Sequence, residues 1–480
     1  MNTIETELKF QVPPATRERL RAALDGPGAA IVALQARYAD TADLRLAAAG
    51  LALRLRREDV RWVQTLKGRG DGLMARPEDE VVLPSSRRPP AIDPSRHAGS
   101  EVGDRLMALL ADGAPLVERY RTEVTRTRRH VRSGGATIEV AFDEGRIVAG
   151  RRRLPVCEVE FELIAGPGAA LFAFAARWAT RHGLWLDVRT KAERGHRLAS
   201  GFDAVPAQKA EPVHWAGSPG PGEVFAATLR NTLAQLLPNA AEIAGGSAAA
   251  EPLHQLRVAM RRLRTALRLI GDWCADPPAA RALEARWREP FGRLGVARDA
   301  DVLAALPGLP LPALPTSPAA EDPGAIVREG AFSVLALDTM ALAAGALPAL
   351  EAPTIDVARA VIARAWRQVA AGAARFAGAE HAEQHRTRRR LKRLRYATEF
   401  LRPLLPATPT TRALAAMRMA LDALGEYNDV LVAEARCRTL DTFDPKVAFA
   451  LGWLAARREM LQTRAARRLE RLQGHRRFWR

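Results

Sequence analysis

Alternation of polar and apolar residues predicts β-strands in the first part of the chain. Residues 4–10, IETELKF, place Glu5, Glu7 and Lys9 on one parity and mostly apolar residues on the other, which is the period of a strand. The same alternation predicts strands at residues 51–58, 61–68, 75–83, 120–131, 136–147 and 156–164. Near the end of the fifth of these, Asp143-Glu144-Gly145 predicts a hairpin turn.

Helices are expected between the strands and throughout the second half. The short ones lie near residues 14–24, 101–111 and 168–182. From about residue 223 the apolar residues recur at helical spacing, most clearly at residues 253–271 and 383–402, and a Pro-rich loop at 306–323 divides this half. The sequence therefore predicts an α+β domain over residues 1–202, a Pro- and Gly-rich linker over 203–222 and an all-α domain over 223–480.

The helical half contains an internal repeat. HQLRVAMRRLR begins at His254 and HRTRRRLKRLR begins at His385, and each is followed by a Leu-Gly pair, at Leu294 and Leu424. Asp299 and Asp429 then align, and we expect each to pair with the basic helix of its own repeat. Two units with one signature predict a duplicated helical bundle.

The polar parity of the predicted strands is charged, and the sign of the charge changes from strand to strand. These residues are Glu5, Glu7, Arg54, Arg56, Lys67, Glu78, Glu80, Arg126, Arg128, Glu158, Glu160 and Glu162. A barrel closed with this parity inward would have a polar lumen, with helices covering its apolar exterior. Carboxylates gathered there need protons or a cation. Acids beside basic residues suit a complex of Mg²⁺ or Mn²⁺ with a polyphosphate.

Several of these segments resemble the CYTH family, also called the triphosphate tunnel metalloenzymes. IETELKF is similar to the family's Glu-x-Glu-x-Lys opening, and the likeness continues in order through RYADTADLRLAAAGLALRLRRE, VQTLKG, CEVEFEL and TKAERGHRL. Thr190 and His196 stand where the family has Ser and Tyr, and neither change removes a charge. The resemblance covers residues 1–200 and implies an eight-stranded antiparallel tunnel that hydrolyses triphosphates with a divalent cation.

The resemblance also implies roles for individual residues. The metal ligands, or groups that orient the attacking water, would be Glu5, Glu7, Asp143, Glu158 and Glu160. The phosphate-binding residues would be Lys9, Arg54, Arg56, Lys67, Arg126, Arg128, Lys191 and Arg194. Among these, Glu5, Glu7, Lys9 and Lys67 are the candidates for direct participation in catalysis. For any one of them the alternative is a surface salt bridge.

Basic residues at helical spacing mark the two repeats. The first stripe is His254, Arg257, Arg261, Arg264 and Arg268, and the second is His385, Arg388, Arg389, Lys392 and Arg395. Like charges three or four residues apart repel, so these stripes either face solvent or bind an anion. They resemble the signature of the CHAD domain, a conserved histidine α-helical domain. The resemblance implies two antiparallel four-helix bundles, related by a pseudo-twofold axis, that bind inorganic polyphosphate, with metal binding by the histidines as an alternative.

Composition is consistent with a polyanionic partner. The 480 residues carry a formal net charge of +18, and the three cysteines lack metal-site spacing. No signal peptide or apolar run of membrane-spanning length is visible. We therefore expect a soluble cytoplasmic protein, free or associated with polyphosphate granules.

Four functions compete at this stage. A metal-dependent inorganic triphosphatase with a polyphosphate-binding module fits best. Adenylate cyclase activity on ATP would use the same phosphate-binding residues. A non-catalytic polyphosphate-granule protein would not need the acids Glu5, Glu7 and Glu160. Binding of single-stranded nucleic acid is disfavoured because no aromatic residues are interleaved with the basic stripes.

Overall fold

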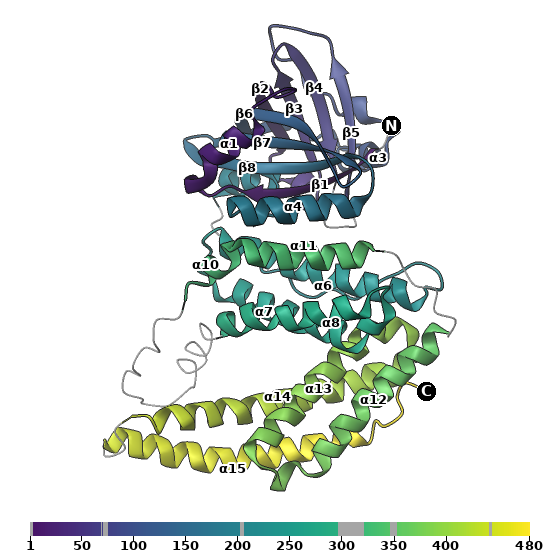
Figure 1. The fold of residues 1–480 in the computed structure, drawn as a ribbon, viewed down its shortest axis with the longest axis vertical. Helices are drawn as coiled ribbons and strands as arrows, with labels where there is room; N and C mark the ends of the chain where they lie inside the picture. Colours follow the sequence, from purple (N-terminus) through teal and green to yellow (C-terminus); the bar gives the residue numbers. More distant parts are fainter. Residues whose placement is uncertain are drawn as a thin grey trace. The chain divides into compact units, whose positions relative to one another are not determined.

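The computed structural model describes residues 3–68, 70, 75–201, 206–295, 321–345, 353–440 and 444–480. Two compact units divide the chain. The first combines Met1–Lys209 with Leu233–Leu256 and Gly324–Ala344, and the second holds Ala210–Thr232, Arg257–Pro323 and Gly345–Arg480. Figure 1 shows the strands in the first part of the chain and helices in the rest. The boundary at residue 202 stays a prediction.

An antiparallel barrel forms the strand region. Its strands are β1 Thr3–Gln11, β2 Ala30–Thr41, β3 Ala52–Glu58, β4 Arg61–Lys67, β5 Ala75–Leu83, β6 Leu116–Ser133, β7 Ala136–Ala149, β8 Arg152–Ala165 and β9 Trp185–Leu186. The sheet order is β5-β4-β3-β2-β6-β7-β8-β1-β9, and a further pairing of β5 with β1 closes β1 to β8 into a barrel. The short β9 adds to β1 beside Phe10 and Gln11. The predicted eight-stranded antiparallel tunnel is confirmed.

The hairpin turn predicted at Asp143-Glu144-Gly145 is wrong. All three residues lie inside β7 and pair with β6 and β8, and the β6–β7 turn lies instead at Gly134 and Gly135. Gly134 and Gly135 both have positive φ, at 58° and 77°, a conformation that glycine adopts without strain. Gly145 permits close backbone approach within the sheet, because a Cβ there would lie 2.0 Å from the carbonyl oxygen of Glu123.

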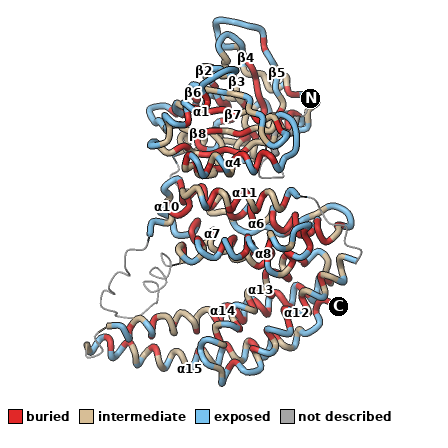
Figure 2. The backbone as a smooth tube through the Cα atoms, in the orientation of Figure 1, coloured by how far each residue is buried: buried red, intermediate tan, exposed pale blue. Residues whose placement is uncertain are grey.

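Apolar residues of the barrel pack outward beneath a helix. α4 (Gly168–His182) covers β7 and β8, and the fully buried Phe161 of β8 lies with its ring centroid 5.4 Å from Phe10, 5.3 Å from Phe174 and 5.6 Å from Trp178. Figure 2 shows buried positions recurring along α4 and the strands. Phe161 and Phe10 occupy the parity opposite to the charged residues of their strands, so the predicted division into an apolar exterior and a charged interior is confirmed.

Helices also close one end of the lumen. The remaining helices of the strand region are α1 Arg17–Leu24, α2 Arg45–Ala48, α3 Glu101–Leu109 and α5 Lys191–Ser200, and α1, α3 and α4 were predicted. Leu198 and Ala199 of α5 pack on an apolar cluster that includes Tyr38 and Tyr120, whose rings stack at 4.6 Å. These tyrosines share the parity of Arg126 and Arg54, so α5 plugs the lumen next to its charged part.

The second half is helical, as predicted. Its helices are α6 Pro221–Ala244, α7 Ala250–Leu269, α8 Pro277–Arg286, α10 Pro323–Arg328, α11 Gly330–Ala344, α12 Thr354–Ala374, α13 His381–Leu401, α14 Ala407–Cys437 and α15 Pro445–Gln473. The helices expected at residues 253–271 and 383–402 correspond to α7 and α13. Most of the Pro-rich loop, and Asp299, lie outside the described residues. Among the described helices, none is long and apolar enough to cross a membrane.

The packing around Phe161 should contribute strongly to the stability of the barrel. Phe161→Ala would leave a cavity among three aromatic rings, and we expect it to lower the free energy of unfolding by about 3–5 kcal/mol. Urea denaturation followed by circular dichroism measures this loss. Phe449→Ala is the control, because Phe449 is 61% exposed. An equal loss of stability in both variants would contradict the stabilising role of the packing around Phe161.

Candidate functional site

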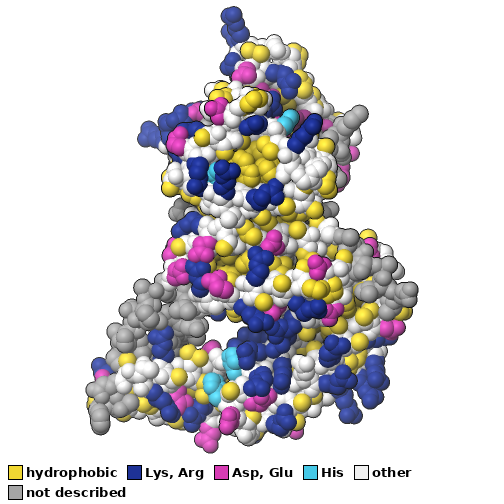
Figure 3. Space-filling view, in the orientation of Figure 1, with side chains coloured by type: hydrophobic (Ala, Val, Ile, Leu, Met, Phe, Trp, Pro, Cys, Tyr) yellow, Lys and Arg dark blue, Asp and Glu magenta, His cyan; other side chains and the backbone are white. Residues whose placement is uncertain are grey.

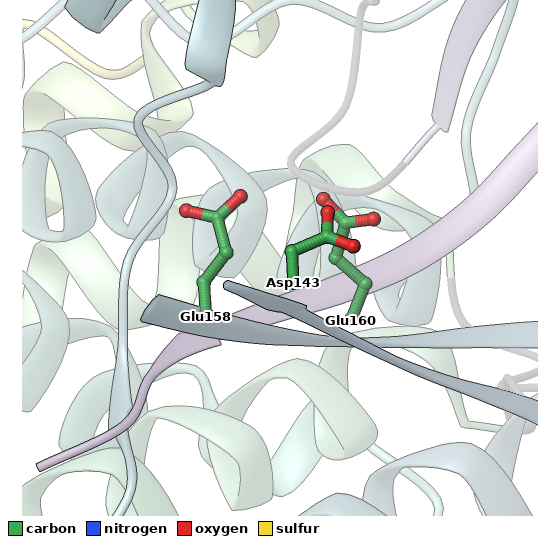
Figure 4. Close-up of side chains that lie close together, drawn as sticks. All are labelled: Asp143, Glu158 and Glu160. Atoms are coloured by element: carbon green, nitrogen blue, oxygen red, sulfur yellow. The ribbon is translucent and has the colours of Figure 1, made fainter. Parts of the chain in front are cut away.

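Three carboxylates meet inside the barrel. Asp143 lies on β7, directly opposite Glu158 of β8, and Glu160 is two residues further along β8 on the same parity. One ligand oxygen from each lies within 4.8 Å of the others, and Asp143 and Glu158 are fully buried. Figure 4 shows the three carboxyl groups pointing to the same side of their strands. We call Asp143, Glu158 and Glu160 the acid trio.

Lys191 and Arg126 each pair with more than one acid of the trio. The ammonium of Lys191 lies 2.6 Å from Asp143 Oδ2 and 2.8 Å from Glu160 Oε1, and it also pairs with Glu158. Arg126 donates from Nε and Nη2 to the two oxygens of Asp143, both at 2.7 Å, and pairs with Glu160 as well. The bidentate geometry fixes the orientation of the Asp143 carboxylate.

These cations keep Asp143 and Glu160 charged. Burial raises the pKa of Asp143 and Glu160, but Lys191 and then Arg126 outweigh it, so both carboxyl pKa values lie below their usual range, that of Glu160 well below. Burial likewise lowers the pKa of Lys191, yet Asp143 and Glu158 raise it above its usual value. At neutral pH Asp143 and Glu160 are therefore carboxylates, and Lys191 is an ammonium ion.

The start of α5 places Lys191 and Arg194 at the acid trio. Thr190 caps the helix through its hydroxyl and exchanges hydrogen bonds with Glu193 in a capping box. This cap fixes the first turn, from which Lys191 reaches all three acids and Arg194 pairs with Glu158. Gly195 lets the helix approach the sheet, because a Cβ there would lie 2.3 Å from the ring of Tyr120.

Strand β1 brings Lys9 to the same region. Lys9 pairs in register with Glu160, its ammonium donates to the carbonyl oxygen of Arg189, and burial lowers its pKa. Glu7 lies opposite Glu162. In the described part of the chain, the group of at least three carboxyl groups with ligand oxygens within 4.8 Å of one another is the acid trio. Glu5 lies on β1 opposite Arg76, and its side chain is outside the description.

A second group of charges comes from β3, β4 and β5. Lys67 Nζ lies 2.8 Å from Glu78 Oε2, Arg54 Nη2 lies 3.8 Å from Glu78 Oε1, and Arg56 Nη2 lies 3.3 Å from Glu80 Oε1. Burial, followed by Arg54, lowers the pKa of Arg56. Within the described residues, Arg54 and Arg56 each have a buried Nε that makes no hydrogen bond. Such donors are available to an anionic ligand.

Arg128 lies apart from both groups. Its guanidinium is half exposed and lies 3.8 Å from Glu139. It follows Arg126 on the same parity of β6 but pairs in register with Ala141, which has no acid to offer. The structure thus brings Arg126, Lys191, Arg194 and Lys9 to the acid trio and places Arg128 nearer the rim.

The acid trio suits a hard divalent cation. Carboxylate oxygens are the ligands that Mg²⁺ and Mn²⁺ prefer, and these ions commonly keep waters and bind phosphate oxygens too. Because Lys191 contacts all three carboxylates, a bound cation would share oxygens with it or displace it. The three carboxylates therefore fit such an ion, and Asp143, Glu158 and Glu160 would be its ligands.

Sequence reasoning missed three residues next to the acid trio. Gln11 donates to Glu158 Oε2 at 3.2 Å and to Asp187 Oδ2 at 3.1 Å, and Asp187 accepts both Nε and Nη2 of Arg189 at 2.9 Å. Gln11 continues the parity of Glu7 and Lys9, so the alternation of β1 could have indicated it. Asp187 and Arg189 lie in an irregular segment, where periodicity gives no signal.

A basic cluster joins the two repeat helices of the second unit. Arg261 of α7 and Arg388, Lys392 and Arg395 of α13 form it, and each arginine has a buried Nε without a hydrogen bond in the described part of the chain. Burial, then Arg388, Arg261 and Arg395, lowers the pKa of Lys392 to about 6, against a smaller opposing effect of Asp429. Figure 3 shows Lys and Arg side chains gathered over α8 and α13, with histidine beside them.

Several residues of the two stripes have protein partners. In the cluster, Arg395 Nη1 donates to Glu399 Oε1 at 3.0 Å. Arg264 and Arg268 both donate to Glu284 Oε1 at 3.0 Å, and Arg257 donates to the carbonyl oxygen of Leu294, beside Gly295. Phe291 packs under the guanidinium groups of Arg257, Arg261 and Arg264. Arg389 is exposed. These contacts preorganise the stripe of α7. The predicted pairing of this stripe with Asp299 stays a prediction, because Asp299 lies outside the described residues.

The histidines of the two stripes differ. His385 Nδ1 lies 3.1 Å from Asn428 Oδ1, and burial lowers its pKa. His254 of α7 is partly buried and lies in the first unit. Among the described residues, the group that offers metal-ligand geometry is the acid trio, which contains no histidine.

The sequence matches two domain families. Residues 3–196 match the CYTH domain and residues 227–438 match the CHAD domain. The chain therefore carries a CYTH domain followed by a CHAD domain, and the resemblance to both families is confirmed.

Known proteins are similar to one or other part of the chain. An inorganic triphosphatase from Haemophilus influenzae is 31% identical over 166 residues, which cover 34% of this chain and 45% of that protein. The chain thus spans about half the length of this relative. A crystal structure of the CHAD domain from the plant Ricinus communis is 28% identical, with a TM-score of 0.41, and covers 55% of this chain and 96% of that one.

A third likeness concerns a protein from Hippeastrum, described as an adenylyl cyclase candidate with a dominant triphosphatase activity. It is 19% identical, with a TM-score of 0.30, and covers 42% of this chain and 98% of that one.

Burial of Lys392 makes stability depend on pH. Its pKa is about 6 in the folded chain and 10.5 when unfolded, so the unfolded state binds the extra proton between these values and stability should fall as pH decreases from about 10 to 6. Lys392→Met should remove this dependence. Guanidinium denaturation midpoints across that range measure it, with the exposed Lys209→Met as control. Parallel pH curves for Lys392→Met and the wild type would contradict the assigned pKa.

Proposed function

We propose that the strand region hydrolyses inorganic triphosphate with the help of Mg²⁺ or Mn²⁺. The acid trio carries this proposal: three carboxyl groups with ligand oxygens within 4.8 Å of one another face a lumen that also holds Lys9, Arg126 and Lys191. Similarity to an inorganic triphosphatase supports the same reaction. A purely anion-binding lumen would be weakened by three carboxylates, whereas a metal–phosphate complex requires ligands of both signs.

Each charged group has a distinct task in the proposed reaction. Asp143, Glu158 and Glu160 hold the cation, with Glu5 and Glu7 of β1 proposed as further acids that hold it or orient water. Phosphate oxygens accept hydrogen bonds from Lys9, Arg54, Arg56, Lys67, Arg126, Lys191 and Arg194. A bound divalent cation supplies charge neutralisation at the phosphates and lowers the pKa of a coordinated water. The protein itself contributes orientation and a dry, charged lumen.

Removal of the charge of one acid of the trio should impair catalysis. Glu160→Gln keeps the size of the side chain but loses the charge that a hard cation needs, so we expect phosphate release from triphosphate to fall by at least about 10-fold and to need more metal. EDTA should abolish the wild-type activity. Phosphate release is measured with Mg²⁺ or Mn²⁺, with triphosphate and ATP as parallel substrates.

Glu123→Gln is the matched control for this experiment. Glu123 lies on the outer parity of β6 and pairs with Arg121 and Arg146, so its loss should leave the rate unchanged. Full activity of Glu160→Gln at every metal concentration, or undiminished activity in EDTA, would contradict the metal assignment. Conversion of ATP to a cyclic nucleotide without phosphate release from triphosphate would favour a cyclase.

The helical half is proposed to bind inorganic polyphosphate through its basic cluster. Arg261, Arg388 and Arg395 concentrate positive charge in a partly buried position beside Lys392, and a chain of phosphates offers one negative charge per unit. Arg257, Arg264, Arg268, His385 and Arg389 extend the cluster along the two stripes. The unbonded Nε donors of the cluster are the observation that favours an anionic ligand over a solvated face.

Charge removal within the cluster should abolish polyphosphate binding. We expect the fourfold variant Arg261→Gln, Arg388→Gln, Lys392→Gln and Arg395→Gln to weaken binding by at least about 100-fold, because each lost charged hydrogen bond contributes about 1.5–3 kcal/mol. Isothermal titration with long-chain polyphosphate measures this, and the wild-type affinity should fall steeply with salt.

A second fourfold variant supplies the control. Replacing Arg464, Arg467, Arg468 and Arg471 of α15 by Gln removes at least as much positive charge from another helix, where these residues line a surface hollow. An equal loss of affinity in this control, or equally tight binding of duplex DNA, would reduce the cluster to a generic polyanion surface.

A further inference from the structure

Residues of the helical half hold the segment that leads into α5. All the contacts concerned lie inside the first compact unit, which includes part of α6 and all of α11. Glu242 of α6 accepts two hydrogen bonds from Arg197 Nη1, at 2.7 and 3.0 Å, and lies 3.8 Å from Arg189 Nη1. Ser333 of α11 accepts the backbone N–H of Leu186 at 2.9 Å.

The fit at this place is close. Glu242 is 8% exposed and Ser333 is 1% exposed. At Gly245, just after α6, a Cβ would lie 2.3 Å from Arg189 Nη1. On the other side, a Cβ at Gly330 would lie 2.9 Å from the carbonyl oxygen of Ala179 in α4. Gly245 and Gly330 thus allow the backbones of α6 and α11 to approach the strand region. The buried Glu242 carboxylate pairs with two arginines of the strand region.

The held segment is directly connected to Lys9. Arg189, whose guanidinium pairs with Glu242 and Asp187, offers its own carbonyl oxygen to the Lys9 ammonium. The backbone N–H of Asp187 also donates to the carbonyl oxygen of Lys9 at 3.0 Å. A displacement of Arg189 would therefore move the acceptor that orients the Lys9 ammonium.

The segment is connected to the acid trio as well. Asp187 accepts from Gln11, which also donates to Glu158. Thr190 follows Arg189 directly and caps α5, which carries Lys191. Arg197, the second partner of Glu242, lies at the far end of the same helix. Glu242 therefore holds α5 and the segment before it at two points, one on each side of Lys191.

We propose that Glu242 is a positioning residue for the triphosphate site: it lies within the CHAD-matched part of the chain, yet it fixes Lys9 and α5 of the CYTH domain through Arg189 and Arg197. This rests on the proposed hydrolysis. In this proposal α6 fixes the geometry of the site in the strand region. Ser333 of α11 contributes a second, weaker contact. Glu242 touches neither substrate nor metal.

The test compares two buried carboxylates of the full-length protein. Glu242→Gln removes the negative charge that pairs with Arg189 and Arg197. We expect kcat/KM for triphosphate to fall by about 10- to 100-fold, which is the effect of a small misplacement of binding groups. Glu434→Gln is the control, because Glu434 of α14 is likewise buried between two arginines, Arg438 and Arg458, in the other unit. Rates are measured well below the unfolding temperature of every variant.

Further variants distinguish positioning from simple loss of stability. Glu242→Asp, which keeps the charge, should recover part of the activity. If Glu242 acts through Lys9, then Glu242→Gln should cost much less in a Lys9→Ala background than in the wild type. If Glu242→Gln does not fold, Ser333→Ala tests the proposal in its place. We expect this variant to lower kcat/KM as well, but by less.

The outcomes are separable from those of the proposed function. A wild-type protein that releases no phosphate from triphosphate overturns the hydrolysis and this inference with it. An active wild type in which Glu242→Gln behaves like Glu434→Gln overturns only the positioning role, as does Ser333→Ala at the wild-type rate when Glu242→Gln is unfolded. Additive losses in the Lys9→Ala background would overturn the route through Lys9.

Discussion

The site depends on compensation between buried charges of opposite sign. Asp143, Glu158 and Glu160 would repel one another in a dry lumen, and burial alone would favour their protonated forms. Lys191 and Arg126 reverse that preference at Asp143 and Glu160, which stay ionised. Removing one of these charged groups would leave the others uncompensated. The strands that carry them and the start of α5 must therefore keep one relative arrangement.

Much of the fold was predictable because alternation and helical spacing report burial directly. The charged parity of β1, β3, β4 and β8 faces inward as predicted, and α7 and α13 follow their apolar spacing. β2 was not predicted, since small residues such as Ala36 and Ala39 blur its alternation. Asp143-Glu144-Gly145 looked like a turn because local sequence cannot show that Arg126 and Lys191 hold Asp143 inside a long strand.

The candidate site was predictable only where residues lie on regular strands or helices. Glu158, Glu160 and Arg126 follow from parity, and Lys191 followed from its motif. The support around Lys9 did not, because Asp187 and Arg189 lie in an irregular segment and Glu242 is far away in sequence. In the helical half, spacing indicated the stripes but could not tell that Glu284 holds Arg264 and Arg268 while Lys392 is partly buried beside three arginines.

The pairing of β1 has a consequence for the order in which the chain can fold during synthesis. β1 is made first, yet its neighbours are β5, β8 and β9, so its edges stay open until residues 75–78, 158–162 and 185–186 have left the ribosome. A strand with unpaired edges is a site of misassociation. The emerging chain must therefore keep residues 3–11 apart from other strands for the time needed to translate most of the barrel.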